Sequence, residues 1–256
     1  MKVSIITICF NNSSDIRPTI ESVINQTYKD IEYIIVDGAS KDNTLEIVNE
    51  YKSKISKIIS EPDNGLYDAI NKGIKASTGD IVGLIHAGDR LHDNEVISKI
   101  VHFYNQNPYV DLSYGNSKIV NSEDRVKRVN ISPEFSLKHV KWGWMPSHQS
   151  IYAKRELFEK FGYYRLDLGG SADYEFVIRY FYKYGTKIRI KRINEFIIKF
   201  SLGGQSTSNY RKKLRKSHKD IIKKCWHLNE LTPPIGIVYR QWMRKIKQYV
   251  LAFIQN

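Results

Sequence analysis

Strand and helix patterns alternate four times in the first part of this chain. Short runs rich in Ile and Val predict buried strands, and each is followed by a segment whose apolar residues recur at helical spacing. The predicted strands cover 3–10, 31–36, 57–60 and 80–85, and the predicted helices cover 15–27, 41–51, 69–75 and 96–104. This alternation is typical of an α/β fold with a mostly parallel sheet flanked by helices on both faces.

Polar residues follow the predicted strands where each strand ends. Asn11, Asn12, Asp37, the run 61–64 and Asp89 all occupy such positions. In open parallel sheets, ligands bind in the crevice beyond the carboxyl ends of the strands. We therefore expect the functional residues at this edge. A looser pattern follows, with a strand expected at 110–114.

Familiar nucleotide and metal motifs are missing at the positions where they would matter. The first predicted strand is followed by 9–14, CFNNSS, rather than by GxGxxG or GxxxxGK[ST]. The two cysteines, Cys9 and Cys225, have no zinc-binding spacing, and no GxSxG elbow occurs. These features exclude a Rossmann dinucleotide site, a P-loop and a cysteine-based zinc site.

Three isolated carboxylates remain as candidates for chemistry. Asp37 follows a strand, so it can accept hydrogen bonds from a base or ribose, or it can cap the next helix. Asp89 ends an apolar strand, where it can hold Mg²⁺ or Mn²⁺ together with phosphate oxygens, or cap a turn. Asp173 follows Gly169-Gly170 at a predicted helix entry, as a cap or as a general base.

The net charge of +13 is unevenly distributed. Residues 205–256 hold twelve Lys+Arg and two Asp+Glu, a net +10, whereas residues 1–204 carry only +3. After Pro233-Pro234, apolar residues recur at helical spacing among basic ones, which predicts a basic amphipathic helix. This extension can bind an anionic membrane surface, pack on the body of the protein or mediate a homodimer. A nucleic-acid-binding protein is disfavoured because the body is nearly neutral.

Length and composition indicate one main domain, 1–204, with a basic helical extension, 205–256. A chain of 256 residues can bury a sizeable core without disulfides, and two unclustered cysteines suit a reducing cytosol. The first apolar run ends at Asn11, which is too short for a signal peptide or a membrane span. We therefore expect a cytoplasmic protein.

Several motifs in a fixed order resemble the family 2 glycosyltransferases of the GT-A fold, and most closely the bacterial branch that builds O-antigen and other surface polysaccharides. The resemblance extends from residue 3 to about 206. The segments that carry it are SIIT at 4–7, QTY at 26–28, EYIIVDGASKDNT at 32–44, SEPDNGLYDAINKG at 60–73, ASTGDIVG at 76–83, HQ at 148–149 and ADYEF at 172–176.

The resemblance implies a donor-binding half, 1–94, and an acceptor-binding half, 95–204. In that family the first half usually binds a UDP-sugar, and the reaction is an inverting transfer to a saccharide. Here the acceptor is expected to be linked to a lipid carrier at the inner face of the cell membrane, with the enzyme bound peripherally. The residues that the resemblance assigns to the nucleotide are Thr7, Asn11, Asp37, Asp63, Gly65, Asn71, His86, Ala87 and Gly88.

The resemblance also assigns a cation site and a base. Asp89 matches the last acid of the family's DxD-like motif, which binds Mn²⁺ or Mg²⁺. This chain departs from that motif because His86 and Gly88 replace an asparagine and an aspartate, which leaves one carboxylate. We expect His86 to be a hydrogen-bond partner rather than a metal ligand. Asp173 matches the catalytic base, with Ala172 where glutamate is common. The degenerate motif leaves open a noncatalytic relative that only binds a nucleotide sugar.

The second half offers further candidates for the acceptor or the diphosphate. His148, which precedes Gln149, either contacts these groups or is a buried structural histidine. Trp144, with Trp142 and Met145, either forms an apolar wall under a sugar ring or belongs to the core. The segment 203–206, GGQS, resembles the mobile segment that closes over the donor in relatives.

Overall fold

The computed structural model describes residues 1–202 and 222–236. Within these residues, nine strands form one sheet in the order β3-β2-β1-β4-β8-β6-β9-β5, and β7 pairs with β6. The parallel part consists of β1 (Val3–Cys9), β2 (Ile31–Asp37), β3 (Lys57–Ser60) and β4 (Ile81–His86). This part confirms the predicted α/β class, and the carboxyl ends of its strands lie at one edge.

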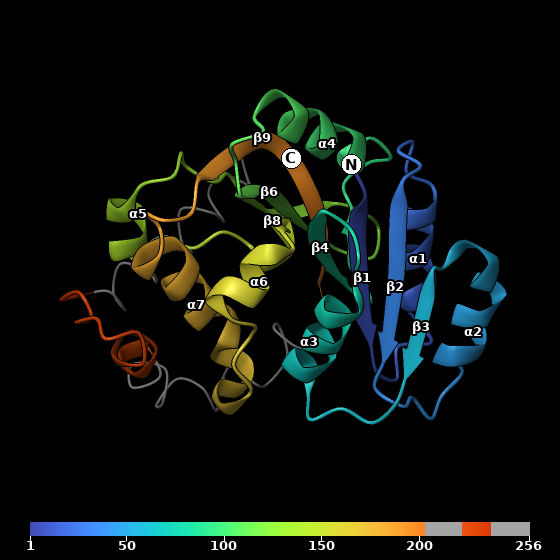
Figure 1. Cartoon of the computed structure of the whole chain (residues 1–256). Coiled ribbons are helices and arrows are strands. Elements are labelled where there is room, and N and C mark those ends of the chain that lie inside the picture. Colours follow the sequence, from blue (N-terminus) through green and yellow to red (C-terminus); the bar gives the residue numbers. More distant parts are fainter. Residues whose placement is uncertain (203–221, 237–256) are drawn as a thin grey trace.

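Alternate side chains of β1 and β2 enter two separate cores. Ile6 and Ile34 belong to a cluster with α3 (Leu66–Ala76), whereas Ile5 and Ile35 belong to a cluster with α1 (Ile16–Ile24). Successive side chains of a strand point to opposite faces, so apolar residues at every position require a cover on both sides. The helix α2 (Thr44–Glu50) contacts α1. Figure 1 shows α3 on one face of the sheet and α1 on the other.

The second half of the sheet is mixed. β8 (Ile151–Lys154) is antiparallel to β4 and β6 (Leu112–Val120) is antiparallel to β8, whereas β9 (Ile190–Ser201) is parallel to β6. The edge elements β5 (Arg90–Leu91) and β7 (Val126–Asn130) are antiparallel to β9 and β6, respectively. The pairing of β5 with β9 brings the end of β9 beside the residues that follow β4.

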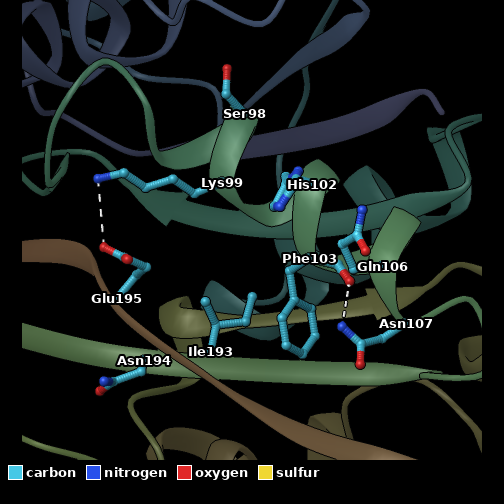
Figure 2. A pocket seen from close by; sticks show the side chains of 9 residues that line it. All are labelled: Ser98, Lys99, His102, Phe103, Gln106, Asn107, Ile193, Asn194 and Glu195. Atoms are coloured by element: carbon cyan, nitrogen blue, oxygen red, sulfur yellow. Dashed lines mark hydrogen bonds and ion pairs between the residues drawn. The ribbon is translucent and has the colours of Figure 1, made fainter.

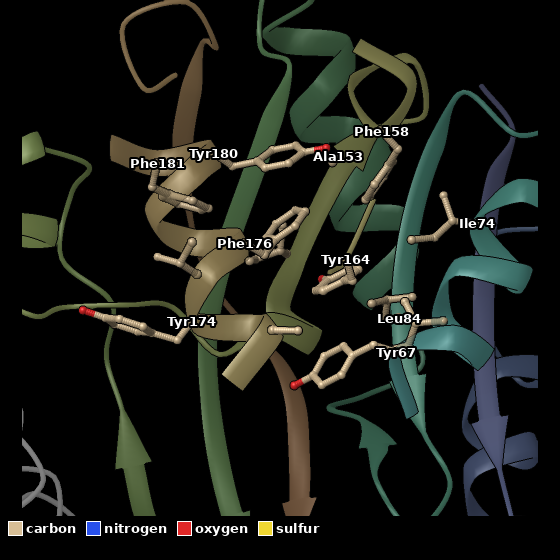
Figure 3. Packing of buried hydrophobic residues seen from close by; sticks show 14 of the residues in the cluster. Tyr67, Ile74, Leu84, Ala153, Phe158, Tyr164, Tyr174, Phe176, Tyr180 and Phe181 are labelled. Carbon is tan, nitrogen blue, oxygen red and sulfur yellow. The ribbon is translucent and has the colours of Figure 1, made fainter. Parts of the chain in front are cut away.

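Helices pack around this half on both sides (Figure 1). They are α4 (Val96–Gln106), α5 (Leu137–Lys141), α6 (Glu156–Phe161) and α7 (Ala172–Val177), and α7 continues into a π-helical turn, η4 (Ile178–Lys183). Three 3₁₀ turns complete the described part: η1 (Lys52–Lys54), η2 (His148–Ser150) and η3 (Leu166–Ser171). Figure 3 shows the aromatic core between α7 and the sheet, in which the rings of Tyr164 and Phe176 stack with centroids 4.6 Å apart.

Most predicted elements form close to their expected positions. The third strand has the predicted bounds, whereas α2 begins at Thr44 rather than at 41, because the side chain of Asp42 accepts hydrogen bonds from the loop residue Ser13 and from the Thr44 amide. The strand predicted at 110–114 starts later and runs to Val120, since it pairs with three other strands over this length.

The described part of the C-terminal extension packs on the body. Residues 222–227 are helical, and Ile222, Cys225 and Trp226, each at most 1% exposed, join the cluster that contains α7. The predicted mobile segment 203–206, the basic run 211–216 and most of the predicted amphipathic helix lie outside the described residues. Within the described residues, no helix is both long enough and apolar enough to span a bilayer.

Candidate active site

Asp89 lies in the turn between β4 and β5, and hydrogen bonds hold both of its carboxylate oxygens. Oδ2 accepts from Gln149 Nε2 at 2.7 Å, and Oδ1 accepts from the backbone N–H of Ser201 at 2.9 Å. Burial raises the pKa of the Asp89 carboxyl to about 6, and the two hydrogen bonds oppose this rise. Since each carboxylate oxygen has two lone-pair positions, the group keeps acceptor capacity for a ligand.

Gln149 connects Asp89 to the end of β4. Its Oε1 accepts the backbone N–H of His86 at 2.8 Å, and the residue is only 2% exposed. The neighbouring residue, His148, lies with its Nε2 atom 3.2 Å from Nε2 of His86. His86 therefore has a hydrogen-bond partner within the protein, and its exclusion as a metal ligand stays a prediction. Burial lowers the pKa of both imidazoles, which keeps them neutral at pH 7.

Asp173 lies in the first turn of α7, half-buried, and its charge acts on His148. Burial lowers the pKa of His148, and the negative charge of Asp173 acts against that shift. The Tyr67 hydroxyl lies near Asp173, and burial together with the negative charge of this carboxylate raises the pKa of the tyrosine. The adjacent residues Gln149 and His148 are therefore each linked to one of the two acids: Gln149 is hydrogen-bonded to Asp89, and the charge of Asp173 acts on His148.

Glu175, the other acid of this segment, is committed to structure. It is 1% exposed, and its Oε1 and Oε2 accept from Arg179 at 2.9 and 3.0 Å. Arg179 also donates to the backbone carbonyl oxygens of residues 161, 162 and 163. A carboxylate that is 1% exposed and paired with Arg179 is not accessible to an incoming substrate, so Asp173 is the acid that α7 presents.

The loops after β1 and β2 are joined to each other. Asn11 has a positive φ of 51°, and its Oδ1 accepts the Lys41 N–H at 2.9 Å. Asp63 accepts the N–H of Gly65 at 2.8 Å and lies so close to Gly38 that a Cβ there would be 2.5 Å from Asp63 Oδ2. Asn11 and Asp63 therefore border the same loop edge.

The other glycines and the alanine of the predicted nucleotide set shape turns. Gly65 has a φ of 103° directly before α3, and Gly88 has a φ of 95° directly before Asp89. Both conformations are ones that residues with a Cβ rarely adopt. Ala87 is half-buried, and its N–H donates to the carbonyl oxygen of Ile8 at 3.1 Å.

Three predicted nucleotide contacts are buried in this structure instead. Thr7 is 0% exposed, and its hydroxyl is 3.0 Å from the hydroxyl of Tyr33. Asn71 is 7% exposed, and its side chain exchanges two hydrogen bonds with the backbone of Tyr164, at 2.8 and 3.0 Å. Each of these two side chains therefore has its partner in the protein interior, and a direct contact of either with the nucleotide stays a prediction.

Asp37 is the third of these residues. It is 0% exposed and accepts from Ser60 Oγ at 2.7 Å and from the Ser40 N–H at 3.1 Å. It does not cap α2, which begins after Asn43. Its carboxylate instead fixes the loop that borders Asn11 and Asp63.

The expectation that Trp144 forms an apolar wall under a sugar ring is corrected, because this residue belongs to the core. Trp144 is 2% exposed and packs on Tyr114 and Phe181, with ring centroids 5.1 and 6.2 Å away, and Met145 packs against the same cluster. Trp142 is 52% exposed, with Lys138 Nζ 5.9 Å from its ring centroid. Trp144 therefore supports the site through packing.

Sequence patterns missed three residues of this region. Tyr67 and Ser201 contact the two candidate acids, and Phe10, 53% exposed, lies against Gly38 at the loop edge. Tyr67 stands inside the quoted segment 60–73, but its side-chain partner is a hundred residues away and leaves no local signal. An aromatic residue directly after a strand, next to a polar cluster, is the signal that could have identified Phe10.

The donor set around Asp89 fits a hard cation that shares its ligands with a phosphate. Within the described residues, no cluster of three or more His, Cys, Asp or Glu is arranged to hold a metal. Mg²⁺ is often bound through one or two carboxylates, with water and substrate phosphates completing the octahedron. One carboxylate with spare lone pairs suits that arrangement and excludes a closed, all-protein metal site in this part of the chain.

A separate surface pocket contains none of these residues. It has a volume of about 550 Å³ and lies between α4 and β9, as Figure 2 shows, with Lys99 ion-paired to Glu195 across it. Its one acid, Glu195, is ion-paired with Lys99, and none of the candidate site residues lines it. We therefore place the candidate site at the strand ends, by geometry rather than by the size of the hollow.

Comparisons with known proteins identify the family of this chain. The family described as Glycosyl transferase family 2 matches residues 4–164. An uncharacterized glycosyltransferase of Mycobacterium tuberculosis is 34% identical over 181 residues, which are 69% of this chain and 68% of that protein.

Two solved structures share the fold at low sequence identity. S. aureus TarS, residues 1–349, superposes with a TM-score of 0.69 at 17% identity over 94% of this chain and 68% of that one. The mannosyltransferase PcManGT from Pyrobaculum calidifontis has a TM-score of 0.60 at 15% identity over 99% and 74% of the two chains. This likeness identifies the GT-A fold. With the match over most of its length, the chain belongs to glycosyl transferase family 2.

Proposed function

We propose that this glycosyltransferase moves a sugar from a UDP-sugar donor to a hydroxyl of a saccharide acceptor, with inversion at the anomeric carbon. The observation that carries the proposal is that the adjacent residues His148 and Gln149 are each linked to an acid: Asp89 is hydrogen-bonded to Gln149, and the charge of Asp173 acts on His148. Crystal structures of TarS with UDP and with UDP-GlcNAc support a uridine donor. The loop edge at Phe10, Asn11 and Asp63 would receive the nucleoside.

Asp173 would act as the general base. The acceptor hydroxyl oxygen forms a bond to the anomeric carbon while the bond from that carbon to the diphosphate oxygen breaks, and its electron pair leaves with UDP. The hydroxyl proton moves to the Asp173 carboxylate. Tyr67, whose hydroxyl lies near this carboxylate, would fix its orientation, and neutral His148 would not neutralise the base as a cation would.

Asp89 would hold the divalent cation, Mn²⁺ or Mg²⁺, and Gln149 and Ser201 would keep the carboxylate in place. The mannosyltransferase PcManGT was solved with GDP-Man and Mn²⁺, which supports a cation in this fold. When bound, such a cation offsets the negative charge that develops on the leaving diphosphate. The smaller donor set of this chain is expected to make cation binding depend strongly on the nucleotide.

The two halves would divide the work. Residues 1–94 would bind the nucleotide and residues 95–204 would form the acceptor side and supply the base.

We propose a lipid-linked acceptor in surface polysaccharide synthesis, with the basic tail on the cytoplasmic membrane surface. A variant in which every Lys and Arg of 211–216 is changed to Gln should sediment less with anionic vesicles. Unchanged sedimentation would remove the membrane from the proposal.

A thermal-shift screen with UDP-, GDP- and dTDP-sugars, with and without Mn²⁺, tests the donor. We expect stabilisation by UDP-sugars that increases with Mn²⁺, followed by UDP release in the presence of acceptor. Asp173→Asn should lower turnover by about 10²–10⁴-fold and leave UDP affinity nearly unchanged. Asp89→Ala should weaken UDP binding in Mn²⁺ only. Turnover by the Asn variant at the normal rate would exclude Asp173 as the base, and binding without turnover of any donor would favour a noncatalytic relative.

A further inference from the structure

The helix that carries Asp173 has few local stabilising bonds at its N-terminal end. α7 spans six residues before it continues into η4, and its N-cap residue, Ser171, makes no side-chain capping bond. The preceding turn contains Gly169, whose φ is 48° and around which a Cβ would meet no atom within 4 Å, followed by exposed Gly170. Helices this short are not stable alone, so α7 depends on tertiary contacts.

The C-terminal extension makes two of these contacts, at the residues directly after Asp173. Trp226 Nε1 donates to the Tyr174 hydroxyl at 3.0 Å, and Asn229 Nδ2 donates to Glu175 Oε1 at 3.1 Å. Trp226 is 1% exposed and Asn229 is 3% exposed. Both hydrogen bonds are therefore shielded from water, where they are worth most.

Glu175 is the point at which the extension and the body meet. Its Oε1 accepts from Asn229 and also from Arg179, whose other nitrogens donate to the backbone carbonyl oxygens of residues 161–163. Asn229 Nδ2 also donates to the carbonyl oxygen of Cys225 at 2.9 Å, which fixes the side chain within its own segment. A shift of the segment 222–231 would therefore move α7 relative to the sheet.

We infer that Trp226 and Asn229 are positioning residues for catalysis, which hold α7 so that Asp173 stays beside His148. The inference rests on the proposed role of Asp173 as the base. It makes the segment 222–231 part of the catalytic half and not only of a membrane-binding tail. Since misplacing a catalytic group by about 1 Å can cost about 100-fold in rate, loss of these contacts affects turnover more than donor binding.

Trp226→Phe in the full-length chain is the first test, because it keeps an aromatic ring and removes the N–H donor. Ile222→Val is the matched control: Ile222 is 1% exposed in the same segment, and the change deletes one buried methyl group without touching Tyr174 or Glu175. We expect Trp226→Phe to lower kcat for UDP release about tenfold with KM for the UDP-sugar unchanged. Ile222→Val should keep kcat within about twofold despite a lower Tm.

Amide hydrogen exchange gives a readout that does not depend on turnover. We expect faster exchange at 172–177 in Trp226→Phe and no change there in Ile222→Val. Asn229→Ser serves as the second variant, with the same expected pattern, if Trp226→Phe does not fold. Equal kcat in the Trp226 variant and the Ile222 control, with unchanged exchange in α7, would overturn the inference. If Asp173→Asn retains full turnover, the proposed role of Asp173 as the base is rejected instead. This outcome can be distinguished, because amide exchange in α7 still reports whether Trp226 and Asn229 hold the helix.

Discussion

The two halves of this glycosyltransferase use their buried polar groups differently. In the parallel half, side chains of neighbouring loops bond to one another, as when Asp37 accepts from Ser40 and Ser60. In the mixed half, buried charges are paired over long stretches of chain, as when Asp111, 7% exposed, accepts two hydrogen bonds from the side chain of Arg189, at 2.9 Å each. The first arrangement needs only correct strands and turns, whereas the second needs the complete fold.

This difference places the two candidate acids in different situations. Asp89 follows a strand of the parallel half, but its oxygens are held by Gln149 and Ser201 from the mixed half. Asp173 belongs to the mixed half, but its hydroxyl neighbour, Tyr67, comes from α3 of the parallel half. Each half therefore supplies neighbours to the candidate acid of the other half, and the site forms only when both halves are joined.

The largest expected effect concerns the buried ion pair of the mixed half. Arg179→Met should destabilise the protein by about 3–5 kcal/mol, because Glu175 would remain buried with its charge unpaired. The free energy of unfolding from urea denaturation measures this loss. The double variant Arg179→Met with Glu175→Gln is the control and should recover part of it. A loss below about 1 kcal/mol in the single variant would mean that the pair is no more important than a surface pair.

The next effect concerns the bond between the halves. Asn71→Ala removes two hydrogen bonds to the backbone of Tyr164 and leaves a buried N–H and C=O unpaired. We expect a loss of about 2–3 kcal/mol in the free energy of unfolding. Asn49→Ala is a suitable control, since Asn49 is an exposed α2 residue that bonds only to the carbonyl oxygen of Leu45 at 2.8 Å. Equal losses in the two variants would show that Asn71 does not join the halves.

Asn71 also shows why some of the site could be predicted and some could not. Strands with an apolar residue at every position and helices with a 3.6 period carry their signal locally, so β3 and the place of Asp89 followed from the sequence. The partner of Asn71 is 93 residues away, and the partner of Asp89 at Ser201 is 112 residues away. The resemblance to the family named the right segments, but it did not reveal that Thr7 and Asn71 face inward, since burial depends on the partner strand or loop.

The pH dependence of cation binding should show how the mixed half tunes Asp89. Burial raises the pKa of its carboxyl to about 6, so the folded protein binds this proton more tightly than the unfolded chain does. Protonated Asp89 therefore contributes stability that is present below about pH 4 and lost as the pH rises through about 6. Above that pH the charged carboxylate is available for Mn²⁺, and binding should weaken about tenfold per unit below pH 6.

The measurement is the Tm increase caused by Mn²⁺ with UDP, at pH 5, 6 and 7. It should grow with pH and be absent in Asp89→Ala. The lowered pKa values of His86 and His148 reduce stability as the pH falls below about 6.5, because the unfolded chain takes up those protons first. This change occurs with and without Mn²⁺ and cancels in the difference. A Tm increase that does not vary with pH would show that Asp89 is charged throughout or is not the ligand.

The smallest expected effect lies in the parallel half and completes the comparison. Arg17 and Glu50 form an ion pair at 2.7 Å between α1 and α2, but their side chains are 43% and 52% exposed. Water already solvates both charges, so Glu50→Gln should leave Tm and donor binding unchanged within error. A clear loss of stability would mean that the parallel half also depends on charge pairing. In that case the same kind of ion pair would stabilise both halves, and the pairs of Arg17 and Arg179 would differ only in how deeply they are buried.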